Sequence, residues 1–431
     1  MATITSAALP LPSAASLLER FQKVRSSTLR LAAPLSAEDA MVQSMPDASP
    51  AKWHLAHTTW FFETFILTER FPAYRIFNPE YRLLFNSYYK SLGAHPVRQQ
   101  RGTFSRPSMA NVLRYREHVD RGMQQLLTHE PSPDRLDFVE LGMHHEQQHQ
   151  ELLLTDILHA FWTQPLRPAY ALPADTADAP SPASLRWISH PGGIVSVGAP
   201  ATGFAFDNER PRHQLLLAPF RLASRLTTNA EYIEFIQDRG YQRPELWLSD
   251  GWDTVCREGW QAPLYWVQDG DGWSQFTLQG MVPVNPFAPV THVSYYEADA
   301  FARWSGARLP LEGEWEQAAA HRAITGNLLE SWTLAPRPAQ GSEVSDAANF
   351  ECQLFGDLWE WTSSAYLAYP GFRTASGAVG EYNGKFMCNQ FVLRGGSFAT
   401  SASHIRASYR NFFPPHVRWQ FMGIRLAAHE R

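Results

Sequence analysis

The sequence feature that most constrains this chain is a pair of histidines inside a helix-forming segment. His145 and His149, in HEQQHQE, are four residues apart, so both imidazoles project from one face of a helix. Apolar residues flank them at the i, i+3, i+7 spacing of a core-facing helix, and Gln148 lies on the same stripe. Polar side chains in a core stripe are costly unless a partner satisfies them. The pair therefore favours a divalent metal ion, with hydrogen-bonded core histidines as the alternative.

A third ligand has to come from another helix. In the segment WHLAH, His57 shares the aromatic stripe of its predicted helix, whereas His54 is better placed as a polar or capping residue. Glu151 lies roughly 200° around the helix from His149 at 3.6 residues per turn, so we expect it outside the coordination sphere. Three neutral nitrogen ligands suit zinc or ferrous iron, and spacing alone does not distinguish the two metals.

The first third of the chain predicts four amphipathic helices. They cover about 17–31, 50–67, 108–127 and 133–161, and the second begins at Ser49-Pro50, read as an N-cap followed by proline at the first helical position. Four helices of this length favour a bundle, whose core is a common place for a metal site. We therefore expect a helical-bundle domain over residues 1–166.

After the predicted bundle, the composition and the pattern of the sequence change. Residues 167–187 are rich in Pro, Ala and Asp, which is typical of a linker. Residues 188–431 alternate short β-like runs with Gly, Pro, Asn and Asp turns, and helical patterns cover 228–237 and 296–304 with a continuation at 312–320. The predicted fold class is therefore α+β, in two domains.

Composition excludes several classes of protein. Of 431 residues, 44% are hydrophobic and 18% charged, which is globular, and the net charge of −5 gives no footprint for nucleic acid or an anionic membrane. No apolar run has the length of a membrane span, and the N-terminus lacks the basic and apolar regions of a secretory signal. Three widely spaced cysteines argue against a disulfide framework. We expect a cytoplasmic protein that acts on small molecules, without nucleic-acid or membrane partners.

Two other segments could carry chemistry. The loop after the second helix contains Tyr88, Tyr89, Arg98 and Arg101. A tyrosine hydroxyl can deliver a proton and an arginine fork matches a carboxylate, although a plain surface loop would have the same composition. Near the C-terminus, asparagine and two phenylalanines at 411–413 could line a pocket, and the arginines around them are expected to tie loops together.

Each half of the chain resembles a known domain. The N-terminal half resembles the DinB-like four-helix bundle, with its HxxxHxE motif at His145, His149 and Glu151. The C-terminal half resembles the formylglycine-generating-enzyme (sulfatase-modifying factor) domain, a variant of the C-type lectin fold, at 206–213, 308–316, 356–362, 394–397 and 423–426. Formylglycine-generating enzymes need two cysteines after their RGGS element, where this chain has Thr400 and Ile405. Their copper–thiolate chemistry is therefore not available here.

The two domains together resemble the sulfoxide synthases of ergothioneine biosynthesis. The resemblance implies iron(II) held by His57, His145 and His149, with dioxygen as co-substrate. It further implies that a thiol sulfur is joined to C2 of the imidazole of hercynine and oxidised to a sulfoxide. In motif alignment, Gln148 corresponds to the residue that holds the hercynine imidazole.

The resemblance also bears on the sulfur donor. Asn411, Phe412 and Phe413 correspond to the pocket around the betaine of hercynine, where the branch that uses γ-glutamylcysteine has Asn-Trp-Asp. This difference disfavours a γ-glutamyl donor.

The tyrosine loop resembles the branch that accepts free cysteine. There, a tyrosine corresponding to Tyr88 or Tyr89 donates a proton, and Arg98, Arg101 and Asp47 fall at donor-side positions. A turn residue before the helix is the alternative for Asp47.

Three other functions stay open at this point. Selenoneine synthases share both domains and the iron site but join a selenosugar to hercynine, and no residue separates them from this chain. A DinB-type thiol transferase would use its metal, often zinc, only to activate a thiolate, and a lectin-like binding protein would have a purely structural bundle. The Asp- and Asn-rich turns of the C-terminal half would also permit a structural calcium ion.

Overall fold

The computed structural model describes residues 14–87, 89, 93, 95–128, 133–171, 183–340, 350–374, 380 and 383–430. The chain divides into two units, and each is described here by itself. The first unit comprises Met1–Ile157, Ala199–Arg212 and Phe372–Tyr382, and the second comprises Leu158–Gly198, His213–Gly371 and Asn383–Arg431. Much of the predicted linker lies outside the described residues, so the boundaries 1–166, 167–187 and 188–431 stay predictions.

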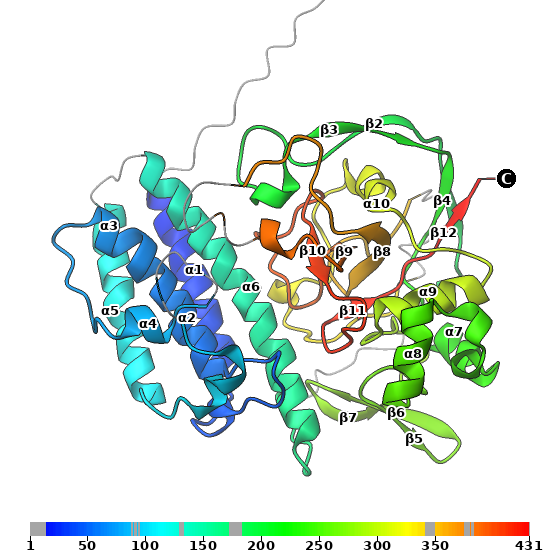
Figure 1. Ribbon diagram of the computed structural model, residues 1–431, viewed down its shortest axis with the longest axis horizontal. Helices are drawn as coiled ribbons and strands as arrows, with labels where there is room; N and C mark the ends of the chain where they lie inside the picture. Colours follow the sequence, from blue (N-terminus) through cyan, green and yellow to red (C-terminus); the bar gives the residue numbers. More distant parts are fainter. Residues whose placement is uncertain are drawn as a thin grey trace, which may run out of the picture. The chain divides into compact units, whose positions relative to one another are not determined.

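Four long helices build the first unit (Figure 1). They are α1 (Ala14–Ala32), α2 (Ala51–Phe62), α5 (Met109–Thr128) and α6 (Pro133–Thr163), and they follow the four predicted segments closely. The shorter elements α3 (Thr68–Arg70) and α4 (Tyr81–Leu84) lie between α2 and α5. One detail of the prediction is wrong: Ser49 does not cap α2, because Pro50 occupies the N-cap position without a side-chain hydrogen bond.

Helix α2 is the central helix of the bundle. All of its residues are buried, and its polar side chains have hydrogen-bond partners, as Lys52 has in the carbonyl oxygens of Phe104 (2.6 Å) and Pro107 (2.8 Å). It continues into a π-helical turn, Glu63–Leu67, before α3. The buried Glu63 carboxylate accepts hydrogen bonds from the hydroxyls of Tyr74 (2.5 Å) and Tyr115 (2.6 Å) and from the Phe77 amide (3.0 Å), so its burial is compensated.

Helix α6 approaches α2 closely at Gly142. A Cβ atom at this position would lie 2.7 Å from the ring of Phe62 and 3.1 Å from the ring of Phe61. A glycine inside a helix costs about 1 kcal/mol relative to alanine, and here it allows the two helices to pack closely. His145 follows one turn later on α6, so this approach brings it next to α2.

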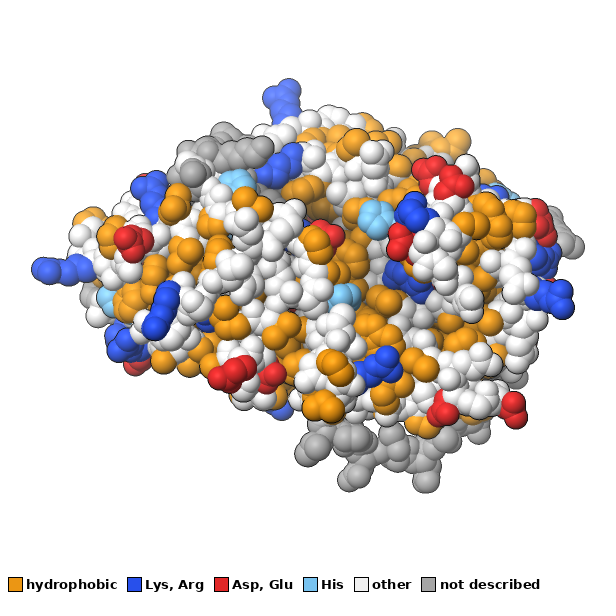
Figure 2. Space-filling view, turned by 60° about the horizontal axis from the view of Figure 1, so that its bottom comes forward, with side chains coloured by type: hydrophobic (Ala, Val, Ile, Leu, Met, Phe, Trp, Pro, Cys, Tyr) orange, Lys and Arg blue, Asp and Glu red, His pale blue; other side chains and the backbone are white. Residues whose placement is uncertain are grey.

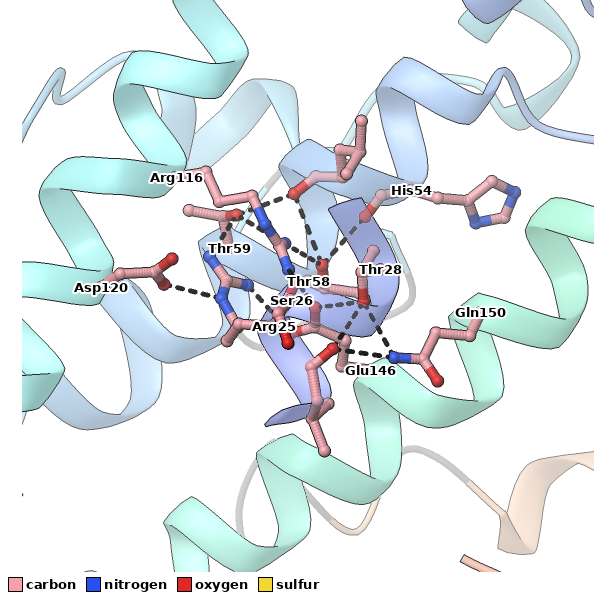
Figure 3. Close-up of polar contacts among 12 residues, drawn as sticks. Arg25, Ser26, Thr28, His54, Thr58, Thr59, Arg116, Asp120, Glu146 and Gln150 are labelled. Carbon is pink, nitrogen blue, oxygen red and sulfur yellow. Dashed lines mark hydrogen bonds and ion pairs between the residues drawn. The ribbon is translucent and has the colours of Figure 1, made fainter. Parts of the chain in front are cut away.

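A buried carboxylate, Glu146, links α6 to the rest of the bundle (Figure 3). It accepts hydrogen bonds from Arg25 (2.9 Å) and Thr28 (2.6 Å) on α1 and pairs with Arg116 on α5. Arg25 also donates to Asp120 at 2.6 Å. Burial alone would raise the pKa of Glu146, but the charges of Arg116 and Arg25 outweigh it and lower that pKa to about 2. The carboxylate is therefore ionised and fully paired.

The second unit mixes helices with small sheets, as the α+β prediction requires (Figure 1). A three-stranded sheet has the order β1-β4-β12, a four-stranded sheet has the order β10-β9-β8-β11, and two further groups are β2-β3 and β5-β6-β7. The strands are β1 (Trp187–His190), β2 (Gly193–Val197), β3 (His213–Leu217), β4 (Phe220–Ala223), β5 (Trp266–Asp269), β6 (Gly272–Thr277), β7 (Gly280–Pro283), β8 (Trp359–Ala365), β9 (Phe391–Arg394), β10 (Asn411–Phe413), β11 (Met422–Gly423) and β12 (Ala427–His429).

The helices of the second unit agree only in part with the predicted ones. They are α7 (Asn229–Gln237), α8 (Ser249–Glu258), α9 (Tyr295–Trp304) and α10 (Glu312–Ala319). The expected continuation of α9 into α10 is wrong, because a loop separates two distinct helices. Helix α8 and the β5–β7 meander were not predicted.

Buried arginines tie the C-terminal loops together, as predicted. Arg425 pairs through two nitrogens with Glu360 at 2.7 and 2.8 Å. Arg394 and Arg410 both donate to the Glu312 carboxylate at 2.9 Å. Because each ion pair joins residues far apart in sequence, the arginines close the loops over the sheets.

On the face drawn in Figure 2, acidic and basic side chains are intermixed, and no patch consists of one sign of charge alone. Among the described residues, no helix has both the length and the apolar character that a membrane crossing requires.

We predict that Glu146→Gln strongly destabilises the bundle. The substitution leaves Arg116 buried with an uncompensated charge and leaves Arg25 with Asp120 as its remaining carboxylate partner, which costs about 3–5 kcal/mol. Denaturant unfolding followed by far-UV circular dichroism measures the effect. Glu140→Gln, on the same helix, is the matched control, because its partner Arg20 is about one-third exposed and such pairs contribute about 1 kcal/mol or less.

The same pair of proteins tests the pH dependence of stability. Since the pKa of Glu146 is lowered to about 2 in the folded protein, its contribution is complete above the ordinary value of 4.5 and is lost as pH falls toward 2. The stability difference between wild type and Glu146→Gln should therefore shrink below about pH 4.5. A difference that stays constant down to pH 3 (about one unit above the folded-state pKa) would contradict this account of Glu146.

Candidate metal centre

The structure brings together the three histidines that the sequence selects as metal ligands. His57 comes from α2, and His145 and His149 come from α6. One nitrogen from each lies within 4.8 Å of the others, and all three side chains are buried. Within the described part of the chain, this is the one group of three or more His, Cys, Asp or Glu side chains found with metal-binding geometry.

The three imidazole rings form a nearly equilateral triangle. Their centroids are 4.6 Å apart for His145 and His149, 5.0 Å for His57 and His145, and 4.9 Å for His57 and His149. The rings of Trp53 and Trp60 stack on His57 with centroid distances of 4.4 and 5.4 Å and interplanar angles of 12° and 15°. The ligand from α2 is therefore held by packing on both of its neighbours in the helical stripe.

Hydrogen bonds determine which nitrogen two of the histidines can offer. Nδ1 of His57 lies 2.7 Å from the carbonyl oxygen of Phe85, and a carbonyl only accepts, so this nitrogen carries the proton. Nδ1 of His149 lies 2.8 Å from a nitrogen of His54. In both residues Nε2 is the atom left for a metal ion.

The electrostatics favour neutral imidazoles. Burial is the main cause of the low pKa of each histidine: it lowers the pKa of His145 to about 4 and holds those of His57 and His149 well below the ordinary 6.5. The neighbouring His145 lowers the pKa of His57 and His149 further. At neutral pH all three rings therefore present lone pairs, and the donor set fits zinc or ferrous iron.

Two other buried polar residues, Glu151 and His54, do not belong to the three-histidine group. Glu151 is buried but does not belong to the three-histidine group, in agreement with the helical geometry. His54 is not a capping residue: it lies between His149 and Asp156, with Nε2 3.1 Å from the Asp156 carboxylate. Sequence reasoning missed Asp156. Its signal was its place seven residues after His149, on the same helical face.

Two of the predicted donor-side residues contact each other. Arg98 lies 3.7 Å from the Asp47 carboxylate and also donates to the Asp47 carbonyl oxygen. Both side chains are partly exposed, at 37% and 58%. The pair is therefore accessible to a small molecule.

Arg101 is buried instead. Its two terminal nitrogens donate to the hydroxyls of Ser49 (2.9 Å) and Ser87 (2.8 Å), and its guanidinium lies 3.5 Å above the centre of the Trp53 ring. Since Trp53 stacks on His57, Arg101 supports a candidate metal ligand through the Trp53 ring.

Among the predicted tyrosines, Tyr88 lies outside the described residues. Tyr89 is buried, and its ring contacts those of Trp60 (5.6 Å) and Phe65 (5.1 Å). It is therefore one aromatic ring away from His57. Gln148 is half-buried on α6 rather than fully in the core, which corrects the stripe prediction at this position.

The predicted betaine pocket residues lie in the second unit. Asn411, Phe412 and Phe413 form β10 and are each half-buried. The Phe412 ring stacks on Tyr366 with centroids 4.0 Å apart and an interplanar angle of 11°. The strand therefore presents an aromatic cluster, and its contact with a substrate stays a prediction.

Comparisons with known proteins agree with both halves of the chain. Residues 20–153 match the DinB superfamily, and residues 174–350 and 347–430 match the sulfatase-modifying factor enzyme 1-like domain. Hercynine oxygenase from Mycolicibacterium thermoresistibile is 31% identical over 440 residues, covering 96% of this chain and 95% of that protein. Its counterpart from Mycobacterium tuberculosis is 31% identical over 425 residues, covering 94% and 96%.

The chain belongs to the hercynine oxygenase family of ergothioneine sulfoxide synthases. The resemblance of the whole chain to this family, and of each half to its domain family, is therefore confirmed. Formylglycine-generating enzyme from Streptomyces coelicolor is also similar, at 26% identity over 310 residues that cover 60% of this chain and 95% of that enzyme. In this member of the hercynine oxygenase family, Thr400 and Ile405 both lie 3.3 Å from a Cβ placed on Gly396, so no thiolate pair faces that turn.

We predict that the double substitution His145→Ala, His149→Ala abolishes stoichiometric metal binding. Two of three ligands are lost, and an ion held by His57 alone would exchange with solvent. Elemental analysis of the purified protein measures the result. The control is His118→Ala, which replaces a half-buried histidine on α5 that is not part of the three-histidine group. Unchanged metal content in the double variant would exclude the three-histidine site.

Proposed function

We propose that this chain is an enzyme that modifies hercynine, joining a sulfur or selenium donor to C2 of its imidazole with iron(II) and dioxygen. One observation carries the proposal: three buried, neutral histidines converge in a chain that aligns over nearly its whole length with hercynine oxygenases. When bound, ferrous iron would supply the site at which dioxygen takes up four electrons. Two come from replacing the S–H (or Se–H) and C2–H bonds by the C–S (or C–Se) bond and two from oxidising the chalcogen to the sulfoxide level, so that one oxygen atom stays on the product and the other leaves as water.

The surrounding residues suit this reaction. Trp53 and Trp60 fix the orientation of His57 and line the centre with apolar surface, which keeps bulk water away from the histidines. Gln148 precedes His149 on α6 and is half-buried, so its amide can contact both solvent and a ligand. We assign it to the imidazole of hercynine. Asn411, Phe412 and Phe413 are assigned to the trimethylammonium end, because aromatic faces attract quaternary ammonium groups.

Tyr89, with Tyr88, is proposed to donate the proton that directs oxidation toward coupling. Tyr89 packs against Trp60, and Trp60 stacks on His57, so the tyrosine belongs to the aromatic wall of the centre. A tyrosine hydroxyl beside the centre can donate its proton to developing negative charge.

Cysteine is the first candidate donor, because Asn411-Phe412-Phe413 replaces the Asn-Trp-Asp of enzymes that use γ-glutamylcysteine. Arg98 and Asp47 would meet its charged groups. A selenosugar is the second candidate, and one observation favours it. Both terminal nitrogens of Arg101 already donate to serine hydroxyls, so recognition of a donor carboxylate would fall on Arg98 alone, whereas a neutral sugar needs no carboxylate contact.

We predict that iron(II)-loaded protein converts hercynine in air with one of three donors: cysteine, γ-glutamylcysteine or a selenosugar. Product masses distinguish a sulfoxide from a carbon–selenium adduct. The reaction should stop without dioxygen, whereas a metal-dependent thiol transferase would continue under anaerobic conditions. If hercynine is not converted with any of the three donors, the proposal is refuted.

We predict that replacing both Tyr88 and Tyr89 with Phe lowers the yield of coupled product by about 100-fold and lowers dioxygen uptake much less. The rings remain, so the aromatic wall is preserved and only the hydroxyls are lost. Tyr81→Phe, another buried tyrosine of the bundle, is the control. Parallel losses of product and dioxygen uptake in the double variant would argue against a proton donor.

A further inference from the structure

Behind the metal centre, a chain of buried polar groups leads away from His149. Its Nδ1 lies 2.8 Å from Nδ1 of His54, and Nε2 of His54 lies 3.1 Å from Oδ2 of Asp156. The same carboxylate oxygen accepts the backbone N–H of Ser49 at 2.7 Å. His54 is 2% exposed and Asp156 6% exposed, so water does not replace these contacts.

If the Asp156 carboxylate is ionised and His54 is neutral, the hydrogen bonds from His149 through His54 to Asp156 permit one arrangement of protons. A carboxylate only accepts, so Nε2 of His54 must carry the proton that it shares with Asp156. Neutral His54 then has an unprotonated Nδ1, which can only accept. Nδ1 of His149 must therefore carry a proton and donate it to His54. The remaining lone pair of His149 is then on Nε2, the nitrogen that this hydrogen bond leaves for a metal ion.

The opposite arrangement is unfavourable. If His54 carried its proton on Nδ1, its bare Nε2 would face the carboxylate oxygen, and the proton of His149 would move to Nε2, where a metal ion has to bind. If His54 carried both protons, its Nδ1–H would donate to Nδ1 of His149, and the proton of His149 would again be on Nε2, where a metal ion has to bind. Asp156 thus determines the tautomer of His54, and His54 in turn determines the tautomer of His149.

We infer that His54 and Asp156 are positioning residues of the metal centre, which hold the His149 imidazole in its Nδ1–H form and orient it toward the ion. The inference rests on one part of the proposed function, the binding of a metal ion by the three histidines. His54 itself is no fourth ligand in this arrangement, because both of its nitrogens are occupied by protein partners.

The His54 side chain points away from the other buried charges of the bundle, to which only its backbone carbonyl is linked, through a hydrogen bond from the hydroxyl of Thr58 (3.1 Å) that in turn accepts from Arg116 (3.3 Å). Figure 3 shows the imidazole of His54 pointing away from the Arg25–Glu146–Arg116 network. His54 comes from α2, whereas Asp156 and His149 are two turns apart on α6, so the chain clamps α6 to α2 beside the ligand. Removing the acceptor of a metal-bound histidine typically lowers metal affinity by about 10- to 100-fold.

The test compares two substitutions of His54 by titration of the full-length apoprotein with Zn²⁺ and, anaerobically, with Fe²⁺. His54→Phe keeps the ring but removes the acceptor, and we expect a 10- to 100-fold higher Kd. His54→Asn places an amide oxygen near the former Nδ1, which can still accept from His149, and we expect most of the affinity to return. His118→Phe, whose ring bonds the Arg75 carbonyl on the bundle surface, should bind as the wild type does.

A second measurement reports the tautomer directly. In Zn²⁺-loaded wild type with isotope-labelled histidine, NMR should show a hydrogen-bonded Nδ1–H on His149, and this signal should be lost or shifted in His54→Phe. Equal affinity of wild type and His54→Phe would overturn the inference. So would equal losses in His54→Phe and His54→Asn with an unshifted His149 signal, because that result indicates packing alone. A wild type that binds neither metal would instead refute the metal centre itself, and with it the proposed function.

Discussion

The buried ion pair of Glu146 with Arg25 and Arg116 is the interaction on which the bundle depends. It joins α1, α5 and α6 through charged groups that no water solvates. A buried carboxylate of this kind tolerates only a narrow range of positions, because each displaced hydrogen bond leaves a charge unpaired. Glu146 directly follows His145 in the chain. Fixing the rotation of α6 about its axis at Glu146 therefore also fixes the direction in which His145 and His149 project.

The support of the centre is built outward from this constraint. Gly142 lets α6 approach α2, the tryptophans of α2 hold His57, and Arg101 stacks behind Trp53. Each ligand is thus oriented by a different physical means: close helix packing, aromatic stacking or a hydrogen bond to a neighbouring group. A site built in this way is rigid before any ion binds, which lowers the entropic cost of binding.

The helices and the convergence of His57, His145 and His149 were predictable because they follow from local periodicity. Spacing of four residues placed His145 and His149 on one face, and the aromatic stripe selected His57 over His54 as the ligand. The partners of Glu146 and His54 were not predictable, because Arg25, Arg116 and Asp156 are 30 to 121 residues away from them and no local pattern encodes such pairing. Arg101 shows the same limit. Its composition suggested a substrate contact, and only the tertiary structure shows it stacked on Trp53 and bonded to two serines. In the second unit, short strands and turns gave the class of the fold, while α8 and the β5–β7 meander lacked a period strong enough to be recognised.

The π-helical turn at Glu63–Leu67 has an evolutionary consequence. It lies between His57, which precedes it on α2, and the loop that carries Tyr89, which follows it. A π turn holds one residue more than an α turn, so gaining or losing a residue here rotates the short helical end Thr68–Arg70 by roughly 100° while leaving the upstream helix in register. The ion-holding half of α2 and the loop beyond it can therefore diverge separately. Insertions in this turn offer a route by which one family could keep its metal ligands unchanged while it changes the molecule that reacts beside them.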